Sequence, residues 1–194
     1  MSQSVDPFEG KGGLKPWRKA ERERLIAARL ALSADVRTAH AAIITEKLDA
    51  MVADVRQKVI AIYWPFRGEP DLRGWAGAMS DRGATIALPV VVEKAAPLVF
   101  RSWKAGEKLE KGVWNIPIPA EGAEVIPDVV ISPVVGFDDG NFRLGYGGGF
   151  YDRTLAALAR RPVVIGVGYE LQRIATIHPQ LHDIAMDVVL TEAG

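Results

Sequence analysis

Apolar residues at helical spacing dominate the first quarter of the chain. Pro16 suits the first turn of a helix that we expect to run through Leu32, because Leu25, Ala28 and Leu32 form one apolar stripe among charged positions. Ser33 is a favoured N-cap and precedes a second helical pattern. The apolar positions of that second pattern are Val36, Ala39, Ile43, Ile44 and Leu48. Two consecutive amphipathic helices are therefore predicted.

Short continuous apolar runs follow, separated by further helical segments. The runs cover residues 58–63, 85–88, 128–132 and 163–167, and the helical segments cover 72–81 and 152–160. Runs of this length are typical of strands buried on both faces, and their alternation with helices favours a mostly parallel sheet in an α/β fold. Segments 97–103 and 112–119 carry prolines or lysines, which favour edge strands or an excursion from the sheet.

Composition is that of one globular domain. The chain has 194 residues, of which 48% are hydrophobic and 25% charged, enough for one substantial core. Residues 1–13 hold Pro7, Gly10, Gly12 and Gly13 with few apolar side chains, so we predict a mobile tail there and a single catalytic domain over 14–194.

Overall charge and the absence of targeting patterns narrow the classes of function. The formal net charge is zero and the pI is about 6.8, so no global field attracts nucleic acid or an anionic membrane. No apolar run has membrane-spanning length, and the N-terminus lacks the pattern of a secretory signal. Cys is absent, which removes disulfide and thiolate chemistry. We expect a cytoplasmic protein.

The stretch from Gly136 to Arg153 is the candidate binding site for a phosphate group. Four of the five residues from Gly145 to Gly149 are glycine, so backbone amides there can close around an anion without interference from Cβ atoms. A helix is expected to start just after this loop, and its unpaired amides would add to the same site. Arg143 supplies a positive charge, and Asp152 supplies a carboxylate that can act either as a helix cap or as a metal ligand.

The familiar nucleotide-binding loops do not fit this stretch. Tyr146 and Gly147 stand where a Walker A loop requires Lys and Ser or Thr, and Phe150 breaks the dinucleotide fingerprint. A plain glycine hairpin remains an alternative, although such a turn needs only one or two glycines. His40, His178 and His182 are too scattered for a zinc site, so carboxylates are better candidates for a metal.

The run from Arg143 to Arg153, RLGYGGGFYDR, resembles the signature of the 5-formyltetrahydrofolate cyclo-ligase family. The resemblance extends along nearly the whole chain. The other stretches that carry it are the basic first helix, Tyr63-Trp64-Pro65 with Glu69, Leu88-Pro89-Val90, Phe100-Arg101-Ser102-Trp103, His182-Asp183 and Leu190-Thr191-Glu192. It implies a three-layer sandwich similar to the ribose-phosphate isomerase and coenzyme A transferase-like group.

The resemblance also assigns site residues. It implies that ATP contacts Lys15, Arg18, Arg143, Leu144, Gly145, Tyr146, Gly147, Gly148, Gly149, Phe150 and Tyr151. It implies that the folate contacts Trp64, Glu69, Gly147, Gly148, Gly149, Phe150 and Tyr151. Arg143, Tyr151 and Asp152 are the expected catalytic residues, and Asp152 and Asp183 the expected magnesium ligands, with Asp187 as an alternative to Asp183. Trp103, Trp114 and Phe150 either line a pocket or fill the core.

The basic first helix has three interpretations. Between Lys11 and Arg29 there are seven basic residues and two acidic ones, a pattern that suits a solvated face or a weaker nucleic-acid site. The resemblance adds the third, in which Lys15 and Arg18 contact ATP and Lys11 or Lys19 can substitute for Lys15.

The expected activity is the ATP- and magnesium-dependent cyclisation of 5-formyltetrahydrofolate to 5,10-methenyltetrahydrofolate, with release of ADP and phosphate. The expected partners are ATP and the folate, without nucleic acid or membrane, in a monomer or homodimer. Two alternatives remain: a sugar-phosphate isomerase of related fold, and a nucleic-acid or ligand-binding module that uses the basic first helix.

Overall fold

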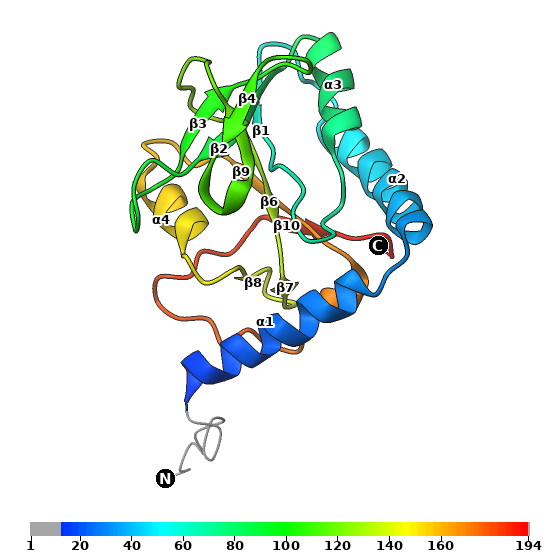
Figure 1. Ribbon diagram of the computed structural model, residues 1–194, viewed down its shortest axis with the longest axis vertical. Helices are drawn as coiled ribbons and strands as arrows, with labels where there is room; N and C mark the ends of the chain where they lie inside the picture. The colour runs from blue at the N-terminus through cyan, green and yellow to red at the C-terminus, as the bar shows by residue number, and fades with distance from the viewer. Residues whose placement is uncertain (1–12, 194) are drawn as a thin grey trace.

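The computed structural model describes residues 13–193 and centres on a six-stranded sheet (Figure 1). The strand order is β10-β9-β6-β1-β2-β3, and only β3 is antiparallel to its neighbour. The strands are β1 (Val59–Ala61), β2 (Thr85–Val90), β3 (Val99–Ser102), β6 (Val129–Pro133), β9 (Val163–Val167) and β10 (Val188–Leu190). The expectation of a mostly parallel α/β sheet is confirmed.

Side chains alternate between the two faces of this sheet, as strand geometry requires. On one face, Ile60 and Ile131 join a large core with residues of α2 (Ala34–Met51) and α3 (Arg73–Asp81). On the other face, the smaller Ala61 and Val130 form a second cluster. Figure 1 shows α2 and α3 on one side of the sheet and α4 (Phe150–Ala157) on the other, which gives three layers.

The N-terminal helix α1 (Leu14–Leu30) lies across one end of these layers (Figure 1). Leu25 and Arg29 are its buried residues. It begins two residues before Pro16 and stops short of Leu32. Residues 1–12, most of the predicted tail, lie outside the described residues, as does Lys11. Within the described part of the chain, no helix combines the length and apolar character needed to cross a membrane.

Ser33 caps α2 as predicted, because its hydroxyl accepts a hydrogen bond of 3.3 Å from Val36 N. The predicted apolar stripe is only partly correct. Ile44 and Leu48 are buried, but Val36 and Ile43 are 38% and 39% exposed. The buried face of α2 therefore includes Ile44 and Leu48 but not Val36 or Ile43.

Two small antiparallel pairs complete the fold. One joins β4 (Leu109–Lys111) to β5 (Pro117–Pro119), and the other joins β7 (Gly136–Phe137) to β8 (Arg143–Leu144). Of the two predicted alternatives, segment 97–103 contains the edge strand β3, and segment 112–119 belongs to an excursion that pairs outside the main sheet. The strands β7, β8 and β10 were not predicted, since two or three residues leave no readable periodicity.

Candidate active site

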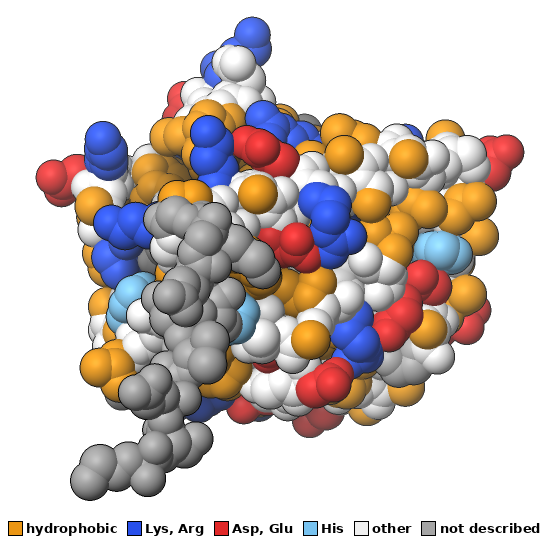
Figure 2. All heavy atoms as spheres, turned by 90° about the horizontal axis from the view of Figure 1, so that it is seen from below, with side chains coloured by type: hydrophobic (Ala, Val, Ile, Leu, Met, Phe, Trp, Pro, Cys, Tyr) orange, Lys and Arg blue, Asp and Glu red, His pale blue; other side chains and the backbone are white. Residues whose placement is uncertain are grey.

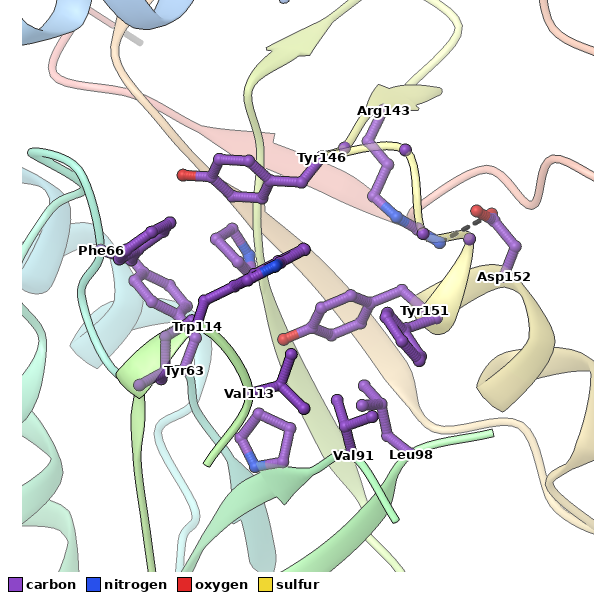
Figure 3. Close-up of a pocket in the computed structure, with 18 of the residues that line it drawn as sticks. Tyr63, Phe66, Val91, Leu98, Val113, Trp114, Arg143, Tyr146, Tyr151 and Asp152 are labelled. Atoms are coloured by element: carbon purple, nitrogen blue, oxygen red, sulfur yellow. Dashed lines mark hydrogen bonds and ion pairs between the residues drawn. The ribbon is translucent and has the colours of Figure 1, made fainter. Parts of the chain in front are cut away.

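A cavity of about 240 Å³ opens at the carboxyl ends of β1, β2 and β6 (Figure 3). In open parallel sheets ligands bind at this edge, where neighbouring connections diverge. Its walls come from the strand ends, the tip of the β4–β5 hairpin, the glycine loop with the start of α4, and α1. Segments far apart in the sequence therefore share one site.

The glycine loop lines this cavity with nearly bare backbone. A Cβ atom at Gly145 would meet no other atom within 4 Å, so the space beside it is open. Gly147 and Gly149 have φ of 97° and 64°, the left-handed region that disfavours other residues. Gly149 is also the N-cap of α4 and provides no side-chain cap. The loop and the helix start thus have the geometry expected of an anion site.

Arg143 and Asp152 form an ion pair on the cavity wall (Figure 3). Arg143 Nη2 donates to Asp152 Oδ1 at 2.7 Å, and Ile184 N donates to the same oxygen at 3.0 Å. Burial lowers the pKa of Arg143, and the charge of Asp152 opposes that shift. Asp152 is therefore held by a buried guanidinium and a distant backbone amide. It is not the cap of α4.

The basic face of α1 reaches the same cavity. Arg18 Nη2 is 2.6 Å from Asp183 Oδ2, and Arg22 Nε donates to Gly145 O at 2.6 Å. Arg22 was not among the predicted site residues, although its spacing of four from Arg18 places both on one helix face. Lys15 is exposed and does not line the cavity. Burial alone would raise the pKa of Asp183, but hydrogen bonds from Arg18 and Gln180 N lower it.

The carboxylates present suit a magnesium ion that is held mainly by phosphates. Among residues 13–193 no cluster of three or more His, Asp or Glu side chains could hold a metal by itself. Both hydrogen bonds to Asp152 end on Oδ1, which leaves Oδ2 available as a ligand. Magnesium commonly combines one or two carboxylates with substrate phosphates and water. Asp187, the alternative ligand, pairs with Arg161 and does not line the cavity.

Glu69 lies 6% exposed in the wall beside the end of β1. Its Oε2 accepts from Phe66 N at 2.9 Å, and its Oε1 accepts from Tyr146 Oη at 2.8 Å. Burial raises the pKa of Glu69 to about 7, although Arg29, Phe66 N and Tyr146 each act to lower it. Trp64, the other residue predicted near this strand end, also lines the cavity and packs edge-on against Trp103.

Aromatic rings close the remaining side of the cavity (Figure 3). Trp114 stacks on Phe66 with ring centroids 6.3 Å apart, and its ring is 6.0 Å from that of Tyr146. It is 53% exposed, and its φ of 56° is unusual for a residue with a side chain. Trp114 and Phe150 thus line the cavity, whereas Trp103 fills the core. Phe66 was not predicted, since nothing in its local sequence distinguishes it from a core residue.

The other predicted residues lie together at this cavity. Leu144, Gly148 and Tyr151 line it, as do Gly145, Tyr146, Gly147, Gly149 and Asp183. Burial raises the pKa of Tyr151, so its hydroxyl remains protonated at neutral pH. Apart from Lys15, the principal site residues predicted from the sequence all line one cavity, whereas the alternatives Lys19 and Asp187 do not. Which ligand each of them contacts remains a prediction.

Comparison with known proteins identifies related chains. The sequence model of the 5-formyltetrahydrofolate cyclo-ligase family matches residues 14–192. The 5-formyltetrahydrofolate cyclo-ligase of Mycolicibacterium smegmatis is 34% identical over 142 residues, which are 69% of this chain and 73% of that protein. The Escherichia coli K12 protein of the same name is 30% identical over 144 residues, 71% of this chain and 79% of its own length.

A solved structure has the same fold. The NMR structure of Aquifex aeolicus 5,10-methenyltetrahydrofolate synthetase superposes with a TM-score of 0.79 and 27% sequence identity. The match covers 91% of this chain and 90% of that one. The arrangement of three layers around a mostly parallel sheet is therefore shared along almost the full length of both chains.

Proposed function

Because the chain belongs to the 5-formyltetrahydrofolate cyclo-ligase family, we propose that it converts 5-formyltetrahydrofolate to 5,10-methenyltetrahydrofolate at the expense of ATP. The observation that carries the proposal is the glycine loop, which faces the same cavity as the aromatic rings and the Glu69 carboxylate. An anion-binding backbone and a pocket for a flat, polar ring are thus adjacent. A phosphoryl transfer to a folate requires that adjacency.

In this proposal the two substrates occupy opposite parts of the cavity. The triphosphate lies against the glycine loop and the start of α4, near Arg143 and the α1 residues Arg18 and Arg22. The folate lies against Trp64, Glu69 and Tyr151, where aromatic faces and a carboxylate suit the donors and acceptors of a pterin ring. Lys15, one turn before Arg18 on α1, is assigned only to the approach of the nucleotide.

The chemistry explains why no nucleophilic side chain is needed. The formyl oxygen is a poor leaving group, so it first accepts the terminal phosphoryl group of ATP and ADP is released. N10 then attacks the formyl carbon and loses its proton, and phosphate departs with the oxygen. The protein's part is to position the reactants and to neutralise charge, as the fixed guanidiniums and backbone amides of this wall would do.

Asp152 would hold a magnesium ion, which would supply positive charge to neutralise the phosphates during the transfer. Asp152 Oδ2 is the oxygen that remains available for it. Asp183 is already bound to Arg18 and to Gln180 N through Oδ2, so any share in a metal would fall to Oδ1. We propose Asp152 as the principal protein ligand. The cytoplasm is the proposed location, and monomer or homodimer the proposed assembly.

The nucleic-acid alternative finds little support on α1. Lys19 pairs with Glu23, Arg24 pairs with Glu21, and Arg29 is buried. On the face seen in Figure 2, Lys and Arg side chains are interspersed with Asp and Glu. A binding surface for nucleic acid would instead require a continuous basic stripe.

The test is a coupled assay on the purified protein. ADP release and formation of the methenyl product are measured together, with and without 5-formyltetrahydrofolate and magnesium. We expect both products in equal amounts, and only when nucleotide, folate and magnesium are all present. Cyclisation without nucleotide, or ADP release that ignores the folate, would contradict the proposal. A sugar-phosphate isomerase of related fold would act without ATP.

A further inference from the structure

A buried arginine ties the glycine loop to the wall that holds Glu69. The side chain of Arg29 is fully buried although it is charged. Its Nε donates to Arg67 O at 2.9 Å and its Nη1 to Val134 O at 3.1 Å. Its Nη2 donates to Tyr146 Oη at 2.6 Å. One guanidinium from α1 therefore holds the loop after β1, the end of β6 and the glycine loop together.

The hydroxyl of Tyr146 stands between this guanidinium and the Glu69 carboxylate. Arg29 Nη2 and Glu69 Oε1 are 3.9 Å apart, beyond hydrogen-bond distance. Tyr146 Oη accepts a hydrogen bond of 2.6 Å from Arg29 Nη2 and donates one of 2.8 Å to Glu69 Oε1. Burial, followed by the charge of Glu69, raises the pKa of Tyr146, so the hydroxyl keeps its proton. A phenol can fill both roles at once because it is donor and acceptor.

We propose that Tyr146 is a positioning residue that keeps the Glu69 carboxylate ionised and aimed into the cavity by relaying the charge of Arg29. This inference rests on the proposed function, in which Glu69 receives the donor groups of the folate ring. It assigns Tyr146 a role through Glu69 in addition to its place in the glycine loop. The glycine loop and the Glu69 carboxylate are thereby linked through the hydroxyl of Tyr146.

Of the side chains that face Glu69, Tyr146 donates a hydrogen bond directly to its carboxylate. Arg29 approaches from α1, Tyr146 from the glycine loop, Tyr63 from the end of β1 and Tyr151 from α4, and Tyr169 also interacts with the Glu69 charge. Arg29 is the cation among the groups that shift the Glu69 pKa. Among residues 13–193, the donors to Glu69 are the Phe66 amide and the Tyr146 hydroxyl, so loss of that hydroxyl leaves the amide as the direct donor.

Loss of the Tyr146 hydroxyl should raise the pKa of Glu69. A hydrogen bond to the ionised carboxylate favours that form, so its removal raises the pKa of Glu69 above its present value of about 7. A charged hydrogen bond of ordinary strength corresponds to an increase of about one pH unit. Tyr146→Phe should then leave Glu69 protonated at neutral pH and restore its charge only at higher pH.

The kinetic test compares Tyr146→Phe with the parent across pH. We expect kcat/KM for the folate to fall about five- to tenfold near pH 7, where about one unit of pKa shift protonates most of the carboxylate, and to recover toward the parent value near pH 9. Tyr169→Phe is the matched control, because the Tyr169 hydroxyl is buried without a hydrogen-bond partner among residues 13–193 and does not line the cavity. Its pH profile should match the parent. An equal loss in Tyr146→Phe at every pH overturns the relay.

A second measurement does not depend on activity, so it separates failure of the relay from failure of the proposed function. Below pH 6 Glu69 is protonated in both folded proteins, whereas the unfolded chain ionises it near 4.5. The stability that this proton contributes is lost as pH rises through the folded pKa, and in Tyr146→Phe the loss continues about one pH unit further.

Denaturant midpoints at pH 5.5, 7 and 8.5 should therefore separate the two proteins mainly above pH 7. In a Glu69→Gln background the gap should not depend on pH. A gap that stays constant with Glu69 present overturns the proposal. If Tyr146→Phe does not fold, Glu69→Gln in the parent carries the test. The inflection near pH 7 must then vanish, and its persistence overturns the assignment.

Discussion

At the scale of single residues, Asp152 shows how one side chain can serve two structural purposes. Its sequence position allows a helix cap or a metal ligand. In the structure it neutralises Arg143, which is only 7% exposed, and accepts from Ile184 N. The carboxylate thus fixes the loop that contains Ile184 to the start of α4, and its Oδ2 remains available to a metal.

Substitution of Asp152 by Asn should therefore affect both stability and magnesium dependence. Asn keeps an acceptor for Ile184 N but leaves the buried Arg143 without its counter-charge, so we expect a loss of roughly 1–3 kcal/mol in the free energy of unfolding. The magnesium concentration for half-maximal cyclisation should rise severalfold. Thermal melts and magnesium titrations measure these two effects.

The matched control is Asp49→Asn, which removes an exposed ion pair with Arg82. Such pairs contribute less than about 1 kcal/mol, so this variant should melt near the parent temperature. Unchanged magnesium dependence in folded Asp152→Asn would remove Asp152 from the metal site.

At the scale of elements, the glycines of one loop are not equivalent. Gly147 has positive φ, and a Cβ at Gly148 would lie 2.7 Å from the Phe150 ring. A side chain at either position would strain the loop itself, so neither cleanly tests ligand binding. Gly145 has no positive φ and faces open space. Among the glycines of this loop, Gly145 is therefore the position where a side chain can block ligand binding without straining the loop.

Gly145→Val is expected to fold normally and to lose nucleotide affinity. Its branched side chain would occupy the space assigned to phosphate, and we predict at least about a tenfold weaker Kd for ATP, or about 1.4 kcal/mol. Calorimetric titration with magnesium-ATP measures it. Gly74→Val is the control, because Gly74 also faces open space but lies in α3, away from the cavity. Parent-like ATP affinity in folded Gly145→Val would argue for a plain glycine turn.

At the scale of the whole molecule, the site draws on both ends of the described chain. Arg18 in α1 pairs with Asp183, and Tyr146 in the glycine loop pairs with Glu69. The β4–β5 hairpin adds Trp114, whose ring lies 6.0 Å from that of Tyr146. Because the proposed nucleotide and folate positions involve different segments, each ligand should order a different subset of them.

Hydrogen exchange should resolve these subsets. Magnesium-ATP alone is expected to slow exchange roughly tenfold in residues 145–152 and 178–184, while the folate alone protects 66–69 and 113–116. Residues 34–43, the first half of α2, do not line the cavity and serve as the internal control, in which exchange should not change. Protection of 66–69 by nucleotide alone, without change in 145–152, would reverse the assignment of the two subsites.

The sequence by itself determined the elements whose signal is local. Continuous apolar runs identified β1, β2, β6 and β9, and the spacing of apolar residues with the Ser33 cap identified α1 and α2. The glycine cluster pointed to the loop that we propose as the anion site, since a lack of Cβ atoms is visible in the sequence alone. The same signals predicted the mostly parallel α/β sheet, because alternation of strand and helix restricts the topology.

Only the tertiary structure decided which charges meet. Arg18 and Asp183 are 165 residues apart, and Tyr146 and Glu69 are 77 apart, so no periodicity connects them. Arg29 reads as one more charge on a basic helix, yet it is fully buried because Arg67 O, Val134 O and Tyr146 surround it. A pairing energy depends on distance and on exclusion of water, and both are set by packing between elements rather than by the order of residues within them.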